Sequence, residues 1–154
     1  DFMALLQMRP DQPEESRAVE WVAYASNAFN TMVPFYANVE RTPEYLANTT
    51  GTVSTDNFYW TSRLIAAMAD ASYNKSLFHL ERYEEAVLSA ARALVNQYDA
   101  KLAAEPDAAR RAALREEANT AIAAMLQEKA ADTLDKVLFE LSSQMKNAYS
   151  RSDA

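Results

Sequence analysis

The sequence predicts an α+β fold with antiparallel strands at its N-terminal end, then a buried helix, then a long antiparallel helical hairpin. Two observations lead to this class. Before residue 40, short runs rich in β-branched and aromatic residues are separated by prolines and polar residues, as strands are. After residue 56, apolar residues recur every three or four positions over long stretches, as they do in helices.

Three strands are expected in the first forty residues. Residues 2–8 form a short apolar run that ends before Pro10 and Pro13, and residues 18–25 follow as a strand antiparallel to it. Residues 32–39 have a similar composition, but Pro34 cannot donate a hydrogen bond to a neighbouring strand. The third strand is therefore expected at a sheet edge, or to begin near this proline.

Two helix starts follow the strands. In Thr42-Pro43-Glu44, a capping residue precedes a proline at the first helical position and an acid in the first turn, which predicts one or two turns of helix through Leu46. The chain then passes its single glycine, Gly51, and reaches three side chains with capping oxygens at residues 54–56. A second helix is expected to begin near Asp56.

This second helix is predicted to be buried on more than one side. One stripe of it consists of Trp60, Leu64, Ala67, Met68 and Ala71, with further apolar residues on an adjoining face. Arg63 is the only charged residue between Asn57 and Ala69. If Trp60 lies in the core, its truncation to alanine costs roughly 3–5 kcal/mol.

The remaining sequence predicts a helical hairpin. Residues 72–76 lack an apolar stripe and indicate a kink, and residues 105–107 contain a proline that separates two long helices. The expected buried positions of the first helix are Leu80, Tyr83, Val87, Ala91, Leu94, Tyr98 and Leu102. Those of the second are Leu114, Ala118, Ile122, Met125, Leu134, Leu138, Leu141 and Met145.

Composition restricts the possible functions. At 154 residues, the chain is long enough for one domain with a substantial core. Its net charge of −7 disfavours binding to nucleic acid or to an anionic membrane surface, and no apolar run is long enough for a membrane helix. Without any cysteine, the chain has no thiol nucleophile of its own. Because the sequence starts at Asp1 rather than methionine, we expect it to be the later part of something longer.

The residues supply no catalytic set and no metal site. His79 is the only histidine, and Ser76 occupies the position three residues earlier where a carboxylate-bridged metal site would need glutamate. The adjacent acids Glu14-Glu15 and Glu116-Glu117 are interpreted as solvated surface. Most aromatic residues are expected in the core, but Tyr36 and Tyr59 are candidate walls of a substrate pocket.

Two specific runs resemble a known enzyme family. Residues 33–43, VPFYANVERTP, and residues 53–60, VSTDNFYW, follow neither a generic strand pattern nor a generic helix pattern. With the flanking segments they resemble the C-terminal part of the dipeptidases of peptidase family C69, over nearly the whole chain. That family is an N-terminal-nucleophile hydrolase family, so the resemblance implies an αββα sandwich in which residues 1–47 supply late strands and a short helix, and residues 48–154 supply the covering helices.

The resemblance also implies a mechanism and partners. A cysteine at the mature N-terminus would attack the peptide carbonyl of a dipeptide, with the α-amino group as base and no metal or organic cofactor. Since this chain lacks cysteine, it is expected to be inactive alone and to need the N-terminal part of the enzyme as its partner. A cytoplasmic homo-oligomer is expected. The alternative is a non-enzymatic helical interaction or assembly module.

Overall fold

The computed structural model describes residues 2–146 and has the predicted α+β class. Its strands β1 (Phe2–Met8), β2 (Ala18–Tyr24) and β3 (Val33–Tyr36) form an antiparallel sheet in the order β1-β2-β3. Its α-helices are α1 (Glu44–Ala47), α2 (Phe58–Ala71), α3 (Tyr73–Ala104) and α4 (Ala108–Ser142). Short 3-10 helices, η1 (Glu14–Ser16) and η2 (Asn27–Phe29), lie between the strands. Residues 147–154, at the end of the predicted second unit, lie outside the described part.

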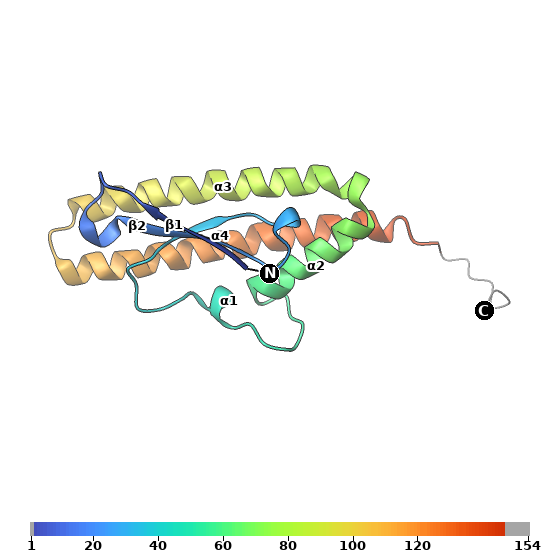
Figure 1. The fold of residues 1–154 in the computed structure, drawn as a ribbon, viewed down its shortest axis with the longest axis horizontal. Helices are drawn as coiled ribbons and strands as arrows, with labels where there is room; N and C mark the ends of the chain where they lie inside the picture. Colours follow the sequence, from blue (N-terminus) through green and yellow to red (C-terminus); the bar gives the residue numbers. More distant parts are fainter. Residues whose placement is uncertain (1, 147–154) are drawn as a thin grey trace.

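The sheet meets the helical hairpin through its β3 edge. All four residues of β3 are buried, and this strand contacts both α3 and α4, between which it lies in Figure 1. β1 is two strands further out, and all seven of its residues are exposed. β3 is shorter than predicted because the chain leaves β2 after the hydrogen bond from the N–H of Ala37 to the carbonyl oxygen of Ala18, and then follows the surface of α4.

Helices α1 and α2 both start differently from the prediction. Pro43, not Thr42, occupies the N-cap position of α1, where no side chain caps the helix. The N-cap of α2 is Asn57, whose side-chain oxygen accepts a hydrogen bond of 2.9 Å from the backbone N–H of Trp60. The predicted cap, Asp56, forms a turn instead: its backbone N–H donates to the hydroxyl of Ser54 at 3.1 Å. The cap of α2 therefore lies one residue beyond the predicted cluster, and residues 54–56 form the turn before it.

For the buried face of α2, the prediction is wrong for the main stripe and confirmed for the adjoining face, since Phe58, Ile65 and Ala69 are buried. The residues that pack inward are Phe58, Thr61, Ser62, Ile65, Ala66 and Ala69. On the predicted stripe, Trp60, Leu64 and Met68 are half-buried, while Ala67 and Ala71 are exposed. α2 packs mainly on α4 and uses one face to do so, so it is an amphipathic covering helix rather than a helix buried on several sides.

The long hairpin follows the prediction for α3 and departs from it in the second half of α4. Six of the seven positions expected in α3 are buried, and Leu94 is partly buried. In α4 the buried stripe continues through Leu126, Ala130, Thr133 and Val137, whereas Leu138 and Met145 are 50% and 64% exposed. The predicted break at residues 72–76 is confirmed, since α2 ends at Ala71 and Ser72 separates it from α3.

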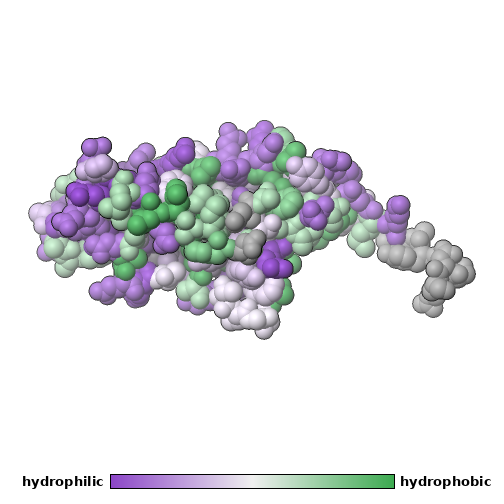
Figure 2. Space-filling model, viewed as in Figure 1, coloured by the Kyte–Doolittle hydropathy of each residue, from purple (hydrophilic) through white to green (hydrophobic). Residues whose placement is uncertain are grey.

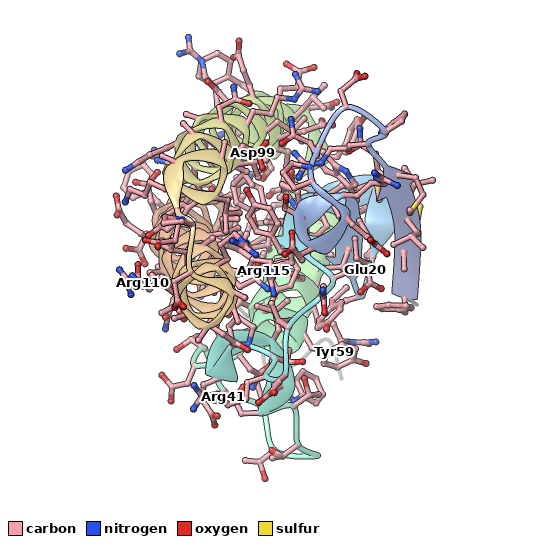
Figure 3. The ribbon with its side chains drawn as sticks, turned by 90° about the vertical axis from the view of Figure 1, so that its left-hand side faces the viewer. Glu20, Arg41, Tyr59, Asp99, Arg110 and Arg115 are labelled. Carbon is pink, nitrogen blue, oxygen red and sulfur yellow. The ribbon has the colours of Figure 1, made fainter. Side chains whose placement is uncertain are left out.

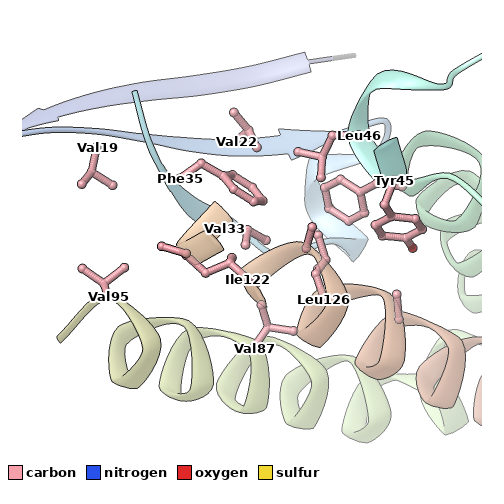
Figure 4. Packing of buried hydrophobic residues seen from close by; sticks show 14 of the residues in the cluster. Val19, Val22, Val33, Phe35, Tyr45, Leu46, Val87, Val95, Ile122 and Leu126 are labelled. Carbon is pink, nitrogen blue, oxygen red and sulfur yellow. The ribbon is translucent and has the colours of Figure 1, made fainter. Parts of the chain in front are cut away.

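A single cluster of buried apolar residues joins the sheet to the helices. Figure 4 shows Val33 and Phe35 of β3 facing Ile122 and Leu126 of α4, with Val87 of α3 close by. Tyr45 and Leu46 of α1 close the same cluster at one end. Burial of these side chains, at roughly 1.5–3 kcal/mol each, is the main force that holds β3 between the helices.

Candidate functional site

The candidate pocket residue Tyr36 lies in a buried polar network. Its side chain is 1% exposed, and its hydroxyl lies 2.7 Å from a carboxylate oxygen of Asp99 and 3.1 Å from the carbonyl oxygen of Val95. Burial and, secondarily, the neighbouring Asp99 raise the pKa of Tyr36 well above its usual value. The phenol therefore stays neutral at physiological pH and is unsuited to act as a base.

Arg9 completes this network from the end of β1. Its guanidinium donates two hydrogen bonds to the Asp99 carboxylate, at 2.7 and 3.1 Å, and lies 5.6 Å from the centre of the Tyr36 ring. A bidentate arginine–carboxylate pair of this kind fixes both side chains in one geometry. The network consequently fastens the turn between β1 and β2 to α3.

Tyr59 lies elsewhere, in the first turn of α2. Its ring packs edge-on against Trp60 at 5.2 Å, and the guanidinium of Arg63 lies over both rings. In Figure 3, Tyr59 is well separated from Asp99, which is the partner of Tyr36. Within this chain, the fold does not bring the two tyrosines into one pocket.

A cavity of about 250 Å³ lies between the sheet, α1 and the loop after β3. Tyr36 borders it, and Tyr59 does not. Its charged residues are Glu20 of β2 and, on the loop, Glu40 and Arg41; Figure 3 shows Glu20 beside the sheet and Arg41 beside α1. Tyr24 adds an aromatic wall, and its pKa is raised by burial and by the nearby Glu20. The cavity thus combines both signs of charge with apolar walls, as binding sites for small polar molecules do.

Three side chains of α4 hold the end of β3 and the loop that follows it. The Asn119 amide accepts from the backbone N–H of Tyr36 at 2.8 Å and donates to its carbonyl oxygen at 3.0 Å. The Glu116 carboxylate accepts from the backbone N–H groups of Glu40 and Arg41, at 2.8 and 3.3 Å. Arg115 donates to the carbonyl oxygen of Asn38 at 2.9 Å. Glu116 is therefore an anchor for the loop rather than the solvated surface residue expected from the sequence.

Little in the sequence indicates that these three residues anchor a loop. Polar residues at 115, 116 and 119 interrupt the apolar stripe of α4, and the burial of Asn119 at 2% exposure could only be inferred once its partner strand was known. Their spacing of three and four residues was the available signal, since it places Arg115, Glu116 and Asn119 on adjacent turns of one side of a helix.

Two of the remaining candidates, His79 and Glu15, contact charged side chains of α4. His79 Nε2 lies 3.3 Å from a carboxylate oxygen of Glu140 in α4. Glu15 pairs with Arg111 at 2.9 Å, and this hydrogen-bonded contact lowers the pKa of Glu15. In residues 2–146, no group of three or more histidine, cysteine, aspartate or glutamate side chains is positioned to hold a metal ion. The same residues include no helix that is both long and apolar enough to cross a membrane.

Comparison with known proteins gives the identity of the family. The sequence profile of peptidase family C69 matches residues 1–86, more than half of the chain. The chain belongs to peptidase family C69. The resemblance of the runs at residues 33–43 and 53–60 is thereby confirmed, since both lie inside the matched region.

Curated relatives of this C69 chain are named dipeptidases. A probable dipeptidase A of Streptococcus pyogenes serotype M18 is 42% identical over 150 residues, which are 97% of this chain and 31% of the relative. A dipeptidase of Bifidobacterium longum is 35% identical over 188 residues, covering 98% of this chain and 35% of the relative. A dipeptidase A of Lactobacillus helveticus is 41% identical over 69 residues. The chain thus spans about a third of the length of the first relatives it matches.

Proposed function

We propose that this chain is the C-terminal section of a cysteine dipeptidase, with an N-terminal cysteine nucleophile supplied by the part of the enzyme outside these 154 residues. The proposal rests on membership of family C69 and on the match to relatives named dipeptidases. The chain corresponds to about a third of the length of each of these first relatives. The α-amino group takes the proton of the thiol, and the thiolate attacks the peptide carbonyl. The C–N bond then breaks as the proton passes to the leaving amine, and water hydrolyses the resulting thioester. This section contains no cysteine, so alone it hydrolyses nothing.

In this proposal, the three strands belong to an αββα sandwich, and the cavity beside β2 forms part of the wall of the substrate site. A dipeptide carries an ammonium group at one end and a carboxylate at the other. Glu20 and Arg41, which both line the cavity, have the charges to meet these two ends. Tyr36 borders the cavity, and its buried hydroxyl holds β3 in place. Tyr59 is part of the substrate site only if the rest of the enzyme extends the pocket toward α2.

The charge of Glu20 provides a test of this cavity. In the native enzyme, Glu20→Gln should raise the KM for dipeptides by about tenfold, because it removes an attraction of roughly 1.4 kcal/mol for the substrate ammonium, while kcat changes little. The matched control is Glu117→Gln, which makes the same chemical change at an exposed residue paired with Arg110. Equal KM values for both variants would remove Glu20 from the substrate site.

Thiol alkylation of the native protein tests the proposed chemistry. Treatment with iodoacetamide should abolish dipeptide hydrolysis, with a loss of at least about 100-fold, because an alkylated cysteine is no longer a nucleophile. Intact mass and N-terminal sequencing of the same sample should show a region led by cysteine upstream of residue 1. Undiminished activity after complete alkylation would contradict a cysteine mechanism.

The second candidate is a non-enzymatic helical interaction or assembly module. The long α3–α4 hairpin and the acidic composition favour it, because both are typical of proteins that act through surfaces. A native protein that hydrolyses no dipeptide before alkylation would favour this candidate. For the enzyme, we propose a cytoplasmic homo-oligomer that binds neither nucleic acid nor membrane and needs no cofactor.

A further inference from the structure

The strand β1 is apolar and exposed on both of its faces. The exposed fractions are 61% for Phe2, 58% for Leu5, 63% for Leu6 and 59% for Met8. Phe2 and Leu6 lie opposite Tyr24 and Glu20 of β2 and share their face, whereas Leu5 lies opposite Trp21 on the other face. In Figure 2, hydrophobic side chains gather across the middle of the molecule, where β1 runs in Figure 1. A strand at the edge of a complete sheet typically has charges on such positions.

The two edges of the sheet differ in whether their outward-facing backbone groups are hydrogen-bonded. At the β3 edge, the outward-facing N–H and C=O groups of Tyr36 are both bonded by the Asn119 amide, which takes the place of a neighbouring strand. At the β1 edge, no strand lies alongside among the described residues. The chain therefore closes one edge with a buried side chain and leaves the other edge open.

The register identifies the backbone groups on the open edge. The backbone N–H of Arg9 donates to the carbonyl oxygen of Arg17 at 2.9 Å, so Arg9 faces β2, and the alternation of an antiparallel ladder places Met3, Leu5 and Gln7 in the same orientation. The N–H and C=O groups of Ala4, Leu6 and Met8 then point away from β2. These three residues have both the backbone groups and the apolar surroundings for pairing with a further strand.

We propose that β1 is an internal strand of a larger sheet in the native protein, and that Ala4, Leu6 and Met8 pair with a strand from the part of the dipeptidase outside this chain. This inference rests on the proposed function, because that function requires such a part. The relatives are about three times as long as the matched region, so enough chain is available to pair with the edge and to cover both faces of β1. Pairing also removes an exposed edge that otherwise promotes aggregation.

Hydrogen exchange of individual amides in the native protein tests the inference, and β1 contains its own control. The amides of Met3, Leu5 and Gln7 bond to β2 and should exchange slowly whether or not a further strand is present. If the edge is paired, the amides of Ala4, Leu6 and Met8 should also exchange at least about 100-fold more slowly than in an unstructured peptide. Fast exchange at these three positions, with slow exchange at the other three, would overturn the inference.

Two further measurements separate this inference from its alternatives. Protection of Ala4, Leu6 and Met8 that disappears on dilution would mean that a second copy of the protein covers the edge, which also overturns the inference. Dipeptide hydrolysis measured on the same sample reports on the proposed function separately. Hydrolysis with an unprotected edge would refute the strand pairing and leave the enzyme intact, whereas a protected edge in an inert protein would refute the enzyme and leave the pairing intact.

Discussion

Replacing Asp99 with alanine is expected to lower the free energy of unfolding by about 3 kcal/mol, because it leaves the Arg9 guanidinium without its carboxylate in a mostly buried site. The side chains of Arg9 and Asp99 are 16% and 13% exposed. The substitution also removes the acceptor at 2.7 Å from the Tyr36 hydroxyl. Urea unfolding of the 154-residue chain at neutral pH, followed by circular dichroism, measures the loss.

A set of controls separates the unpaired charge from the lost hydrogen bond. Asp99→Asn keeps an oxygen for Tyr36 but loses the ion pair, so it should fall between the wild type and Asp99→Ala. The double variant Arg9→Met with Asp99→Leu removes both charges and should recover part of the loss, since no charge is left buried and unpaired. If the double variant is as unstable as Asp99→Ala, the unpaired guanidinium is not the cause.

The predictable part of the fold is the part that local patterns determine. The strand at residues 2–8 follows from a short apolar run that prolines end, and the strand at residues 18–24 from its β-branched and aromatic composition. The α3 stripe from Leu80 to Leu102 follows from three- and four-residue spacing. The break at Pro106 follows from the chemistry of proline. Each of these signals lies within one element and needs no knowledge of the neighbouring ones.

The missed features depend on which elements become neighbours. With a rise of 1.5 Å per residue in both helices, residue 139 of α4 lies about level with the start of α3 at residue 73, so Met145 extends past that start and is exposed. Thr61 and Ser62 pack inward in α2 because their small side chains allow the helix to lie close to its neighbours, a preference that hydrophobicity does not reveal. Asn119 bonds to the end of β3 and Glu116 to the loop after it, some 80 residues away in sequence, so their roles appear only in the folded chain.

Phe58→Ala is expected to cost about 3–5 kcal/mol of stability, because it leaves a cavity where three elements meet. Phe58 is completely buried, and its ring lies 5.3 Å from that of Tyr24 in β2 and 6.0 Å from that of Tyr45 in α1. Phe58 is the first residue of α2, directly after the cap Asn57, so loss of the ring also loosens the capping turn. Thermal and urea unfolding of the 154-residue chain provide the measurement.

Trp60→Ala is the matched control for Phe58→Ala. The sequence pattern places Trp60 in the buried stripe, whereas the structure leaves it half-buried, so a smaller cost is expected. Trp60 lies two residues further along α2, is half-buried, and donates its indole N–H to the carbonyl oxygen of Thr50 at 2.8 Å. Loss of that hydrogen bond and of partial packing should cost only about 1 kcal/mol in the isolated chain. A cost equal to that of Phe58→Ala would contradict the observed orientation of α2. A larger cost in the native enzyme than in the isolated chain would instead show that the rest of the enzyme covers this face, because burial there would add to the contribution of the indole ring.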